Sequence, residues 1–233
     1  MSAPRVLDPR AVAVIGTDAH LPAVPDERLQ PQALRQRFLN PRPWAPEFVG
    51  DGRFDSLRHP AAAAVLVPLV QRDDGLHVLL TQRTAHLRDH AGQISLPGGR
   101  SEPQDPDAAA TALREAHEEV GLAPHLVEVL GTLPVYTTTT QFVVTPVVGL
   151  VPALDSRALA LDAFEVAEAF EVPLAFLMTP AHHRRHHYSH EGSERLFLSM
   201  PWPGRGADGV EREYFIWGAT AAMLRNLYRF LSA

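Results

Sequence analysis

Residues 98–122 of this 233-residue chain read GGRSEPQDPDAAATALREAHEEVGL, and this stretch decides the fold. It predicts a helix that starts at Asp105 and Pro106, an N-cap residue followed by a proline at the first helical position. The run 108–113 has high helix propensity. Gly121 is placed to end the helix in a left-handed conformation. The stretch therefore predicts one helix with a defined start and end.

Three carboxylates gather on one face of the predicted helix. Glu115, Glu118 and Glu119 are spaced i, i+3, i+4, so their side chains point the same way. Such like charges repel one another unless a cation offsets them, and hard divalent cations prefer oxygen ligands. Arg114 precedes Glu118 by four positions and is expected to pair with it. A solvated acidic face is the alternative, but the pattern favours a metal site that catalyses attack on a phosphate.

The same residues resemble the signature of the Nudix hydrolases, G-x5-E-x7-R-E-U-x-E-E-x-G-U, in which U is aliphatic. The matching positions are Gly99, Asp105, Arg114, Glu115, Ala116, Glu118, Glu119, Gly121 and Leu122. Two departures concern Asp105: it replaces the usual Glu, and eight residues rather than seven separate it from Arg114. Ala116 is also small for an aliphatic position. The departures leave the role of Asp105 open and do not affect the three carboxylates.

A second resemblance lies just upstream, where residues 79–99 read LLTQRTAHLRDHAGQISLPGG. It is similar to the signature of coenzyme A pyrophosphatases within the Nudix family, L-L-T-x-R-[SA]-x3-R-x3-G-x3-F-P-G-G. The matching positions are Leu79, Leu80, Thr81, Arg83, Arg88, Gly92, Pro97, Gly98 and Gly99. Thr84 and Leu96 depart from the signature and keep its general character.

The resemblance implies a set of metal ligands. Glu115 and Glu119 would ligate Mg²⁺ or Mn²⁺ most directly, and Glu118 would share metal binding or act as the base. Gly99 would bring the backbone close to the metal and the phosphates, where a side chain would clash. A plain tight turn is the alternative for the glycine pair.

The general base stays open between three glutamates. Glu118 is one candidate, and Glu165 and Glu168 are the others. We expect residues 163–170 to be helical, and a surface helix explains the last two glutamates equally well.

Substrate recognition is expected between residues 83 and 93. Coenzyme A carries a 3′-phosphate besides its pyrophosphate, and a guanidinium can hold a phosphate in bidentate fashion. We assign this task to Arg83 and Arg88, with His90 as a helper.

Five histidines form a second cluster, His182, His183, His186, His187 and His190. Histidine-rich tracts can bind transition metals. Here the histidines alternate with arginines, and no acidic or cysteine partner closes a site. We expect a solvated loop before a strand, or phosphate contact at the rim of the pocket, rather than a zinc site.

Composition limits the class of protein. The net charge of −6 gives no basic field for nucleic acid, and the absence of cysteine excludes disulfides and thiol chemistry. The absence of cysteine suits a cytoplasmic protein, and the first residues lack the features of a signal peptide. Residues 132–154 are uncharged, but their prolines and threonines indicate two strands and a turn rather than a membrane helix.

The chain divides into a proline-rich N-terminal extension, residues 1–58, and a Nudix domain, residues 59–233. The extension is expected to contain a short helix over 30–38 and to lie on the domain, to be partly disordered, or to reach the partner subunit of a homodimer. In the domain, strands are predicted over 61–70, 76–82, 126–135, 142–150, 196–200 and 213–217, with a final helix over 220–231. Strands mixed with two major helices imply an α/β/α sandwich with a mixed sheet.

Three functions are compatible with these patterns. The first is hydrolysis of coenzyme A or acyl-CoA to 3′,5′-ADP and 4′-phosphopantetheine or its acyl form. The second is hydrolysis of another nucleoside diphosphate derivative, such as ADP-ribose or a dinucleotide. The third is a catalytically silent nucleotide-binding protein, against which the costly cluster of carboxylates argues.

Overall fold

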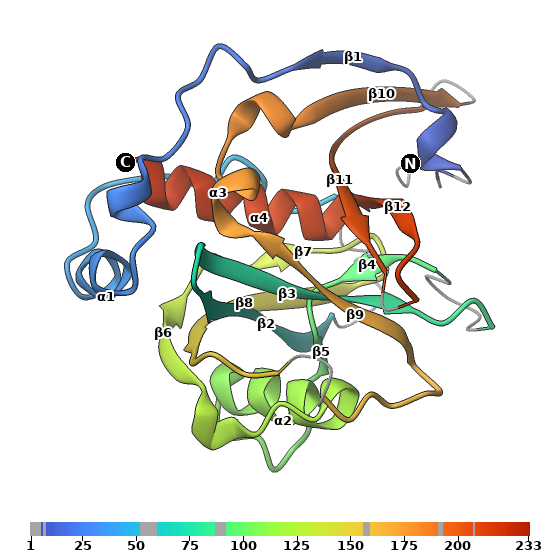
Figure 1. Ribbon diagram of the computed structural model, residues 1–233. Coiled ribbons are helices and arrows are strands. Elements are labelled where there is room, and N and C mark those ends of the chain that lie inside the picture. The colour runs from blue at the N-terminus through green and yellow to red at the C-terminus, as the bar shows by residue number, and fades with distance from the viewer. Residues whose placement is uncertain are drawn as a thin grey trace.

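The computed structural model describes residues 6, 8–51, 60–86, 92–155, 159–190, 193–206 and 208–233. An eight-stranded mixed sheet lies between helix α2 (Ala108–Val120) and helix α4 (Gly218–Ser232), as Figure 1 shows. The predicted α/β/α sandwich with a mixed sheet is therefore confirmed.

The central sheet is built on β2 and β8, which run parallel to each other, and its other pairs are antiparallel. Its path is β4 (Ile94–Ser95), β3 (Gly75–Arg83), β2 (Ala61–Arg72), β8 (Phe142–Val151) and β6 (Glu128–Thr132). Three strands pair off this path: β5 (Gly98–Arg100) with β2, β7 (Tyr136–Thr137) with β8, and β9 (Val166–Pro173) with β3. The predicted hairpin between β2 and β3 is confirmed, because Arg72 pairs with Gly75 across the turn.

Each face of this sheet has its own apolar core. On one face, Ala112, Ala116 and Val120 of α2 are buried in a cluster with Leu66 and Val147 of the sheet. The small side chain of Ala116 thus faces the sheet, where it allows the helix to lie close. On the other face, α4 buries its apolar residues in a larger cluster with β3, β8 and β9. The sheet therefore separates the two helices.

Helix α2 ends at the predicted residue but starts at a different one. The N-cap is Asp107, whose carboxylate accepts a hydrogen bond from the backbone N–H of Ala110 at 2.8 Å. The predicted start at Asp105 and Pro106 is therefore wrong, because Asp105 is engaged elsewhere. The predicted C-cap is confirmed: Gly121 has φ 71°, in the left-handed region.

A second sheet covers one end of the domain. Two of its four strands contain the predicted strands over 196–200 and 213–217, and the other two strands were not predicted. Its order is β1 (Val14–Thr17), β10 (Arg184–His190), β11 (Ser193–Arg205) and β12 (Glu211–Trp217), all antiparallel. In the histidine-rich segment, where a loop was expected, His186, His187 and His190 lie on strand β10, and His182 and His183 lie in the turn just before it. His186 is buried, stacks on Phe197 at 4.6 Å and contacts the Ser199 hydroxyl at 2.8 Å. It is a core residue of this sheet.

The predicted helix over 163–170 is also wrong. This segment runs into β9, which pairs along β3 from Arg83–Val166 to His77–Pro173. Alternate residues Val166, Phe170 and Val172 are buried. Alanine and glutamate favour a helix locally, but pairing and burial along β3 outweigh that preference.

Residues 8–51 are fastened to the domain. Helix α1 (Pro31–Leu39) confirms the predicted short helix, and it lies beside the C-terminal end of α4, where the rings of Phe38 and Phe230 are 4.6 Å apart (Figure 1). The short helices are α3 (Leu174–Leu177) and 3₁₀ turns at Pro9–Ala11, Asp26–Arg28, Pro124–Leu126 and Pro180–His182. The proposed domain boundary after residue 58 falls outside the described residues.

A buried charge network joins this N-terminal segment to the domain. Arg225 of α4 is 1% exposed and contacts Asp18 at 3.2 Å and Glu47 at 2.7 Å. Arg185 of β10 contacts the same two carboxylates at 2.7 and 2.6 Å. Each buried charge therefore has partners of opposite sign, as burial requires.

The uncharged segment 132–154 contains the whole of β7 and β8, so the two predicted strands are confirmed. No helix among the described residues is long and apolar enough to cross a membrane.

Candidate active site

The glycine pair on β5 lies directly against the carboxylates of α2. The backbone N–H of Gly98 donates a hydrogen bond to the Glu119 carboxylate at 3.2 Å. A Cβ added to Gly99 would lie 2.4 Å from a carboxylate oxygen of Glu115. One added to Gly98 would lie 2.4 Å from the backbone oxygen of Ala64. At both positions the missing side chain allows close approach, to the backbone of β2 at Gly98 and to the Glu115 carboxylate at Gly99.

Arg114 holds the next part of the site in place. It forms a bidentate pair with Asp105, with N–O distances of 3.1 and 2.9 Å. Its third nitrogen, Nη1, donates to Glu115 at 2.9 Å and to Glu118 at 3.0 Å, so the predicted Arg114–Glu118 pair is confirmed. Arg114 therefore orients two of the three glutamates.

Asp105 positions Arg114. Its carboxylate also accepts hydrogen bonds from the Thr111 hydroxyl and the Glu102 backbone N–H, both at 3.0 Å. These bonds, with the Arg114 guanidinium as the largest influence, hold the pKa of Asp105 well below its usual range. The aspartate is therefore ionised and fixed, and the shorter side chain still reaches the arginine across the longer spacing.

Glu119 is the most buried of the three glutamates, with 6% of its surface exposed. Burial raises the pKa of Glu119 to about 7, against the opposing effects of the Gly98 N–H and of Arg83. Burial also raises the pKa of Glu115, while Arg114 opposes the shift. Burial thus disfavours the ionised forms of Glu115 and Glu119, and a cation bound beside them would favour those forms again.

Arg83, at the end of β3, bridges two further carboxylates. Its guanidinium lies 3.7 Å from Glu119 and 3.8 Å from Glu165. Glu165 is close enough to raise the pKa values of both Glu119 and Glu115. The structure therefore brings Glu165 to the cluster.

Glu168 is placed elsewhere. It lies on β9 on the same side as Phe170 and Val172, which pack in the core of the α4 face. Its carboxylate pairs with Arg212 of β12 at 3.4 Å. Of the two later candidates for the general base, only Glu165 adjoins the α2 carboxylates.

A cavity of about 470 Å³ opens beside Gly98 and Arg83. Its walls come from the central sheet, the start of α4 and the second sheet. Such a volume suits a small organic ligand. The other predicted substrate residues, Arg88 and His90, lie outside the described residues.

The cavity also contains residues that the sequence reasoning missed. Asp51 and Arg195 form an ion pair in its wall, and Thr138, Thr139 and Thr140 line it as well. No local pattern marks the first two, because 144 residues separate them. The threonine run was visible in the sequence but carried no spacing typical of a ligand site.

The donors fit a hard divalent cation. Glu115 and Glu119 offer carboxylate oxygens beside the Gly98–Gly99 backbone, and both are half-buried or buried. Among the described residues, no three acidic, histidine or cysteine side chains are already grouped closely enough to hold a metal ion. Two of the glutamates are turned toward Arg114 instead. Glu115 nevertheless lies against the backbone of Gly99, so its carboxylate reaches the glycine turn while it is bonded to Arg114.

A sequence model of the NUDIX domain matches residues 59–190, which is more than half of the chain. The chain belongs to the NUDIX family. The uncharacterized Nudix hydrolase NudL of Escherichia coli K12 is 44% identical over 179 residues, covering 74% of this chain and 83% of NudL. Nudix hydrolases act on pyrophosphate bonds of nucleoside diphosphate derivatives and generally need a divalent metal, so this chain is an enzyme of that kind.

Solved structures resemble it more distantly. A MutT protein from Methanosarcina mazei Go1 is 24% identical, with a TM-score of 0.41 over 52% of this chain and 83% of that protein. A MutT/nudix family protein from Enterococcus faecalis is 16% identical, with a TM-score of 0.44 over 77% of this chain and 65% of that protein.

Proposed function

We propose that this Nudix hydrolase cleaves the pyrophosphate bond of coenzyme A or acyl-CoA. The products would be 3′,5′-ADP and 4′-phosphopantetheine or its acyl form. The observation that carries the proposal is the segment 79–99, whose sequence resembles the coenzyme A pyrophosphatase signature. In the fold this segment supplies Arg83 and the glycine turn, which lie at the carboxylate cluster and at the adjoining cavity.

The proposed chemistry uses the carboxylates in two ways. Glu115 and Glu119, with Gly99 beside them, would hold Mg²⁺ or Mn²⁺, and Glu118 would complete the set. When bound, the cation neutralises phosphate oxygens and lowers the pKa of a bound water. Arg114 orients the glutamates through its bonds to Glu115 and Glu118.

We assign the general base to Glu165. It is partly exposed and adjoins the buried Glu119, so it can accept a proton from an attacking water. The water oxygen bonds to one phosphorus while the bridging P–O bond breaks, and the other phosphate leaves. Glu118 remains the competing candidate, and Glu165→Gln and Glu118→Gln should be compared by kcat.

Recognition of the 3′-phosphate is assigned to Arg88, with His90 assisting. Arg83 is close enough to the carboxylates to contact the pyrophosphate. Arg88→Ala should weaken hydrolysis of coenzyme A more than hydrolysis of dephospho-coenzyme A, which lacks the 3′-phosphate. Equal losses on both substrates would reject that assignment.

The test of the function is direct. The purified protein is incubated with coenzyme A and Mg²⁺ or Mn²⁺, and 3′,5′-ADP is measured. Glu119→Gln is the inactive variant, and Glu128→Gln, an exposed glutamate on β6, is the matched control. Product from the wild type and the control alone supports the proposal. If the protein cleaves only ADP-ribose or a dinucleotide, that compound rather than coenzyme A is its substrate. If it cleaves none of the three compounds, the result favours a nucleotide-binding protein without activity.

A further inference from the structure

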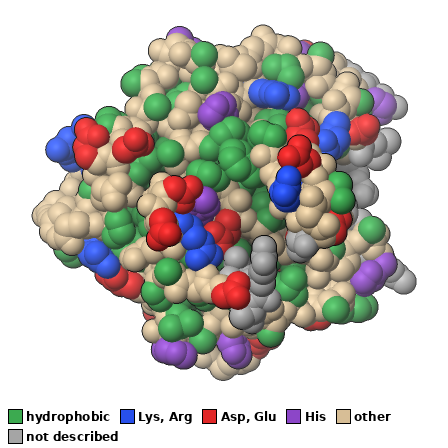
Figure 2. All heavy atoms as spheres, in the orientation of Figure 1, with side chains coloured by type: hydrophobic (Ala, Val, Ile, Leu, Met, Phe, Trp, Pro, Cys, Tyr) green, Lys and Arg blue, Asp and Glu red, His purple; other side chains and the backbone are tan. Residues whose placement is uncertain are grey.

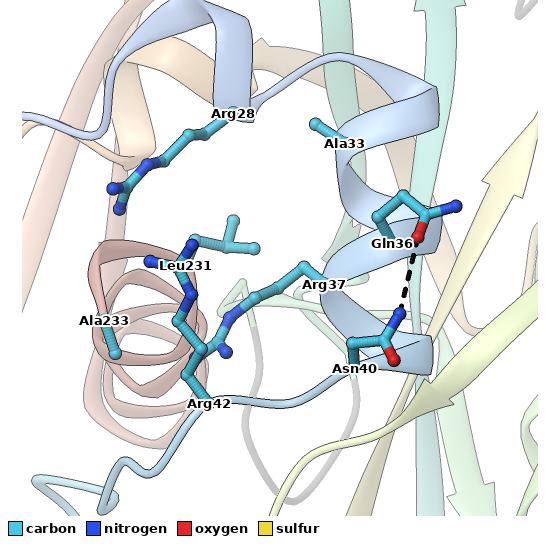
Figure 3. A pocket seen from close by; sticks show the side chains of 8 residues that line it. All are labelled: Arg28, Ala33, Gln36, Arg37, Asn40, Arg42, Leu231 and Ala233. Carbon is cyan, nitrogen blue, oxygen red and sulfur yellow. Dashed lines mark hydrogen bonds between the residues drawn. The ribbon is translucent and has the colours of Figure 1, made fainter.

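A second cavity, of about 330 Å³, lies between α1 and the C-terminal end of α4. Figure 3 shows three arginines around it: Arg28 from the turn before α1, Arg37 from α1, and Arg42 just after α1. Among the described residues that line it there is no aspartate or glutamate. The remaining wall is formed by two amides and by small or apolar side chains, including Ala33 and Leu231.

The excess of one charge is unusual for this protein. On the face that Figure 2 shows, acidic and basic side chains lie among one another. Other arginines follow this pattern: Arg35, on the same helix as Arg37, forms a bidentate pair with Glu128 at 2.7 Å. Among the described residues, no aspartate or glutamate pairs with the arginines of the cavity. The α-carboxylate of Ala233, which also lines it, can offset one of the three positive charges, so an excess of positive charge remains.

Backbone carbonyls use only part of the donor capacity of these arginines. Arg37 donates from Nε and Nη2 to the carbonyl oxygen of Phe230, at 2.8 and 2.6 Å, and its guanidinium lies 4.3 Å from the Phe230 ring. Its Nη1 is buried and has no hydrogen-bond partner. Arg28 makes one weak bond, to the Ser232 carbonyl at 3.3 Å. Arg42 is exposed and makes no hydrogen bond or ion pair with any described residue.

The charges also act on one another. Burial and the positive charges of Arg42 and Arg28 lower the pKa of Arg37. The two carbonyls at the end of α4 explain why arginines lie here, since a helix C-terminus favours cations. They do not explain three arginines, one of which contacts neither carbonyl. An anion between the guanidinium groups would remove the repulsion.

We propose that this cavity binds the phosphate group of a small organic phosphomonoester. Guanidinium groups form bidentate hydrogen bonds with phosphate oxygens, and a doubly charged anion matches several converging arginines. The volume exceeds what a bare phosphate needs, and the wall at Ala33 and Leu231 is apolar, which suits an organic group attached to the phosphate.

The site is separate from the candidate active site. α4 lies on the face of the central sheet opposite to α2, which carries the catalytic glutamates. Along α4, the cavity is lined by Leu231, whereas the cavity beside Gly98 extends as far as Met223. The two positions are eight residues, or about 12 Å, apart along the helix. Binding here does not depend on the proposed hydrolysis of coenzyme A.

The test measures binding of AMP and of inorganic phosphate to the full chain in EDTA, by calorimetry and ³¹P NMR. EDTA removes divalent metal from the candidate active site, and AMP has no pyrophosphate bond to be cleaved. The variants are Arg42→Ala, which removes an unpaired side chain, and the double variant Arg28→Ala/Arg42→Ala. Arg205→Ala, which removes an exposed arginine on β11, controls for net charge.

We expect saturable binding of AMP to the wild type and to Arg205→Ala. Arg42→Ala should weaken it about tenfold, the size of one charged hydrogen bond, and the double variant should abolish it. Tighter binding of AMP than of phosphate would support an organic ligand, and equal binding would restrict the site to the phosphate group itself. No saturable binding to the wild type, or equal affinity in a folded double variant, would overturn the proposal.

Discussion

Replacing Gly98 or Gly99 by alanine should have different effects, because a Cβ at Gly98 would meet backbone atoms and a Cβ at Gly99 would meet a side chain. At Gly98 the new Cβ would lie 2.4 Å from the Ala64 carbonyl oxygen and 2.5 Å from the Val65 Cα, both backbone atoms of β2. These two atoms cannot move unless the backbone of β2, a central strand of the sheet, moves with them. Overpacking of this kind costs about 1–3 kcal/mol. For a domain of this size a cost of about 2 kcal/mol lowers Tm by roughly 4–8 °C.

At Gly99 the new Cβ would meet only the end of the Glu115 side chain, at 2.4 Å. That side chain can rotate away, so the free energy of unfolding should change by less than about 1 kcal/mol. The rotation displaces a carboxylate that we assign to the metal. Displacement of a catalytic group by an ångström can cost about 100-fold in rate. Gly99→Ala should therefore keep its Tm and lose activity.

The assay combines thermal unfolding with kcat for coenzyme A and with Mn²⁺ affinity by electron paramagnetic resonance. Gly16→Ala is the matched control, because a Cβ on this strand residue would meet nothing within 4 Å. Gly98→Ala should lower both Tm and kcat, Gly99→Ala only kcat and Mn²⁺ affinity, and Gly16→Ala neither. The reasoning is refuted if Gly99→Ala keeps wild-type kcat and Mn²⁺ affinity, or if Gly98→Ala keeps wild-type Tm.

Three other predictions concern charged groups. Arg225→Met leaves Asp18 and Glu47 with only the partly exposed Arg185 as a partner and should lower the free energy of unfolding in urea by about 3 kcal/mol; the same change at the exposed Arg229 on the same helix should not. Burial lowers the pKa of His183 to about 4, so as pH falls below about 6.5 the unfolded chain binds a proton before the folded chain does. Between pH 7 and pH 4 the free energy of unfolding of the wild type should therefore fall by about 3 kcal/mol more than that of His183→Gln. Parallel curves of unfolding free energy against pH would contradict this. Asp105→Asn should lower kcat about tenfold with little change in Tm, because Arg114 loses its charged partner; an unchanged kcat would remove Asp105 from the positioning role.

The elements that the sequence predicted correctly are those with local signals. Gly121 ends α2 because a glycine adopts positive φ without a steric penalty, and the hairpin before Gly75 follows from its turn residues. The shared face of Glu115, Glu118 and Glu119 follows from helical spacing alone. Each depends on residues within a few positions of one another.

The errors came from segments whose partners are far away in sequence. Residues 166–173 form a strand because β3 offers them hydrogen bonds and a buried face. The histidine tract becomes a strand because β11 and the N-terminal β1 enclose it. The N-cap of α2 is a different case: Asp105 is bonded to Arg114, only nine residues away, and Asp107 caps the helix instead. For both strands, pairing with distant segments outweighs a local preference of about 1 kcal/mol or less.

By itself the sequence determined helix α2, the glycine turn and the carboxylate set, because regular spacing on one helix fixes which side chains share a face. Only the tertiary structure decided which distant residues join them. It brought Arg83 and Glu165 to Glu119, separated Glu168 from the cluster, and grouped the arginines beside α1. Those contacts depend on how strands and helices pack, and packing is set by the whole core rather than by any local pattern.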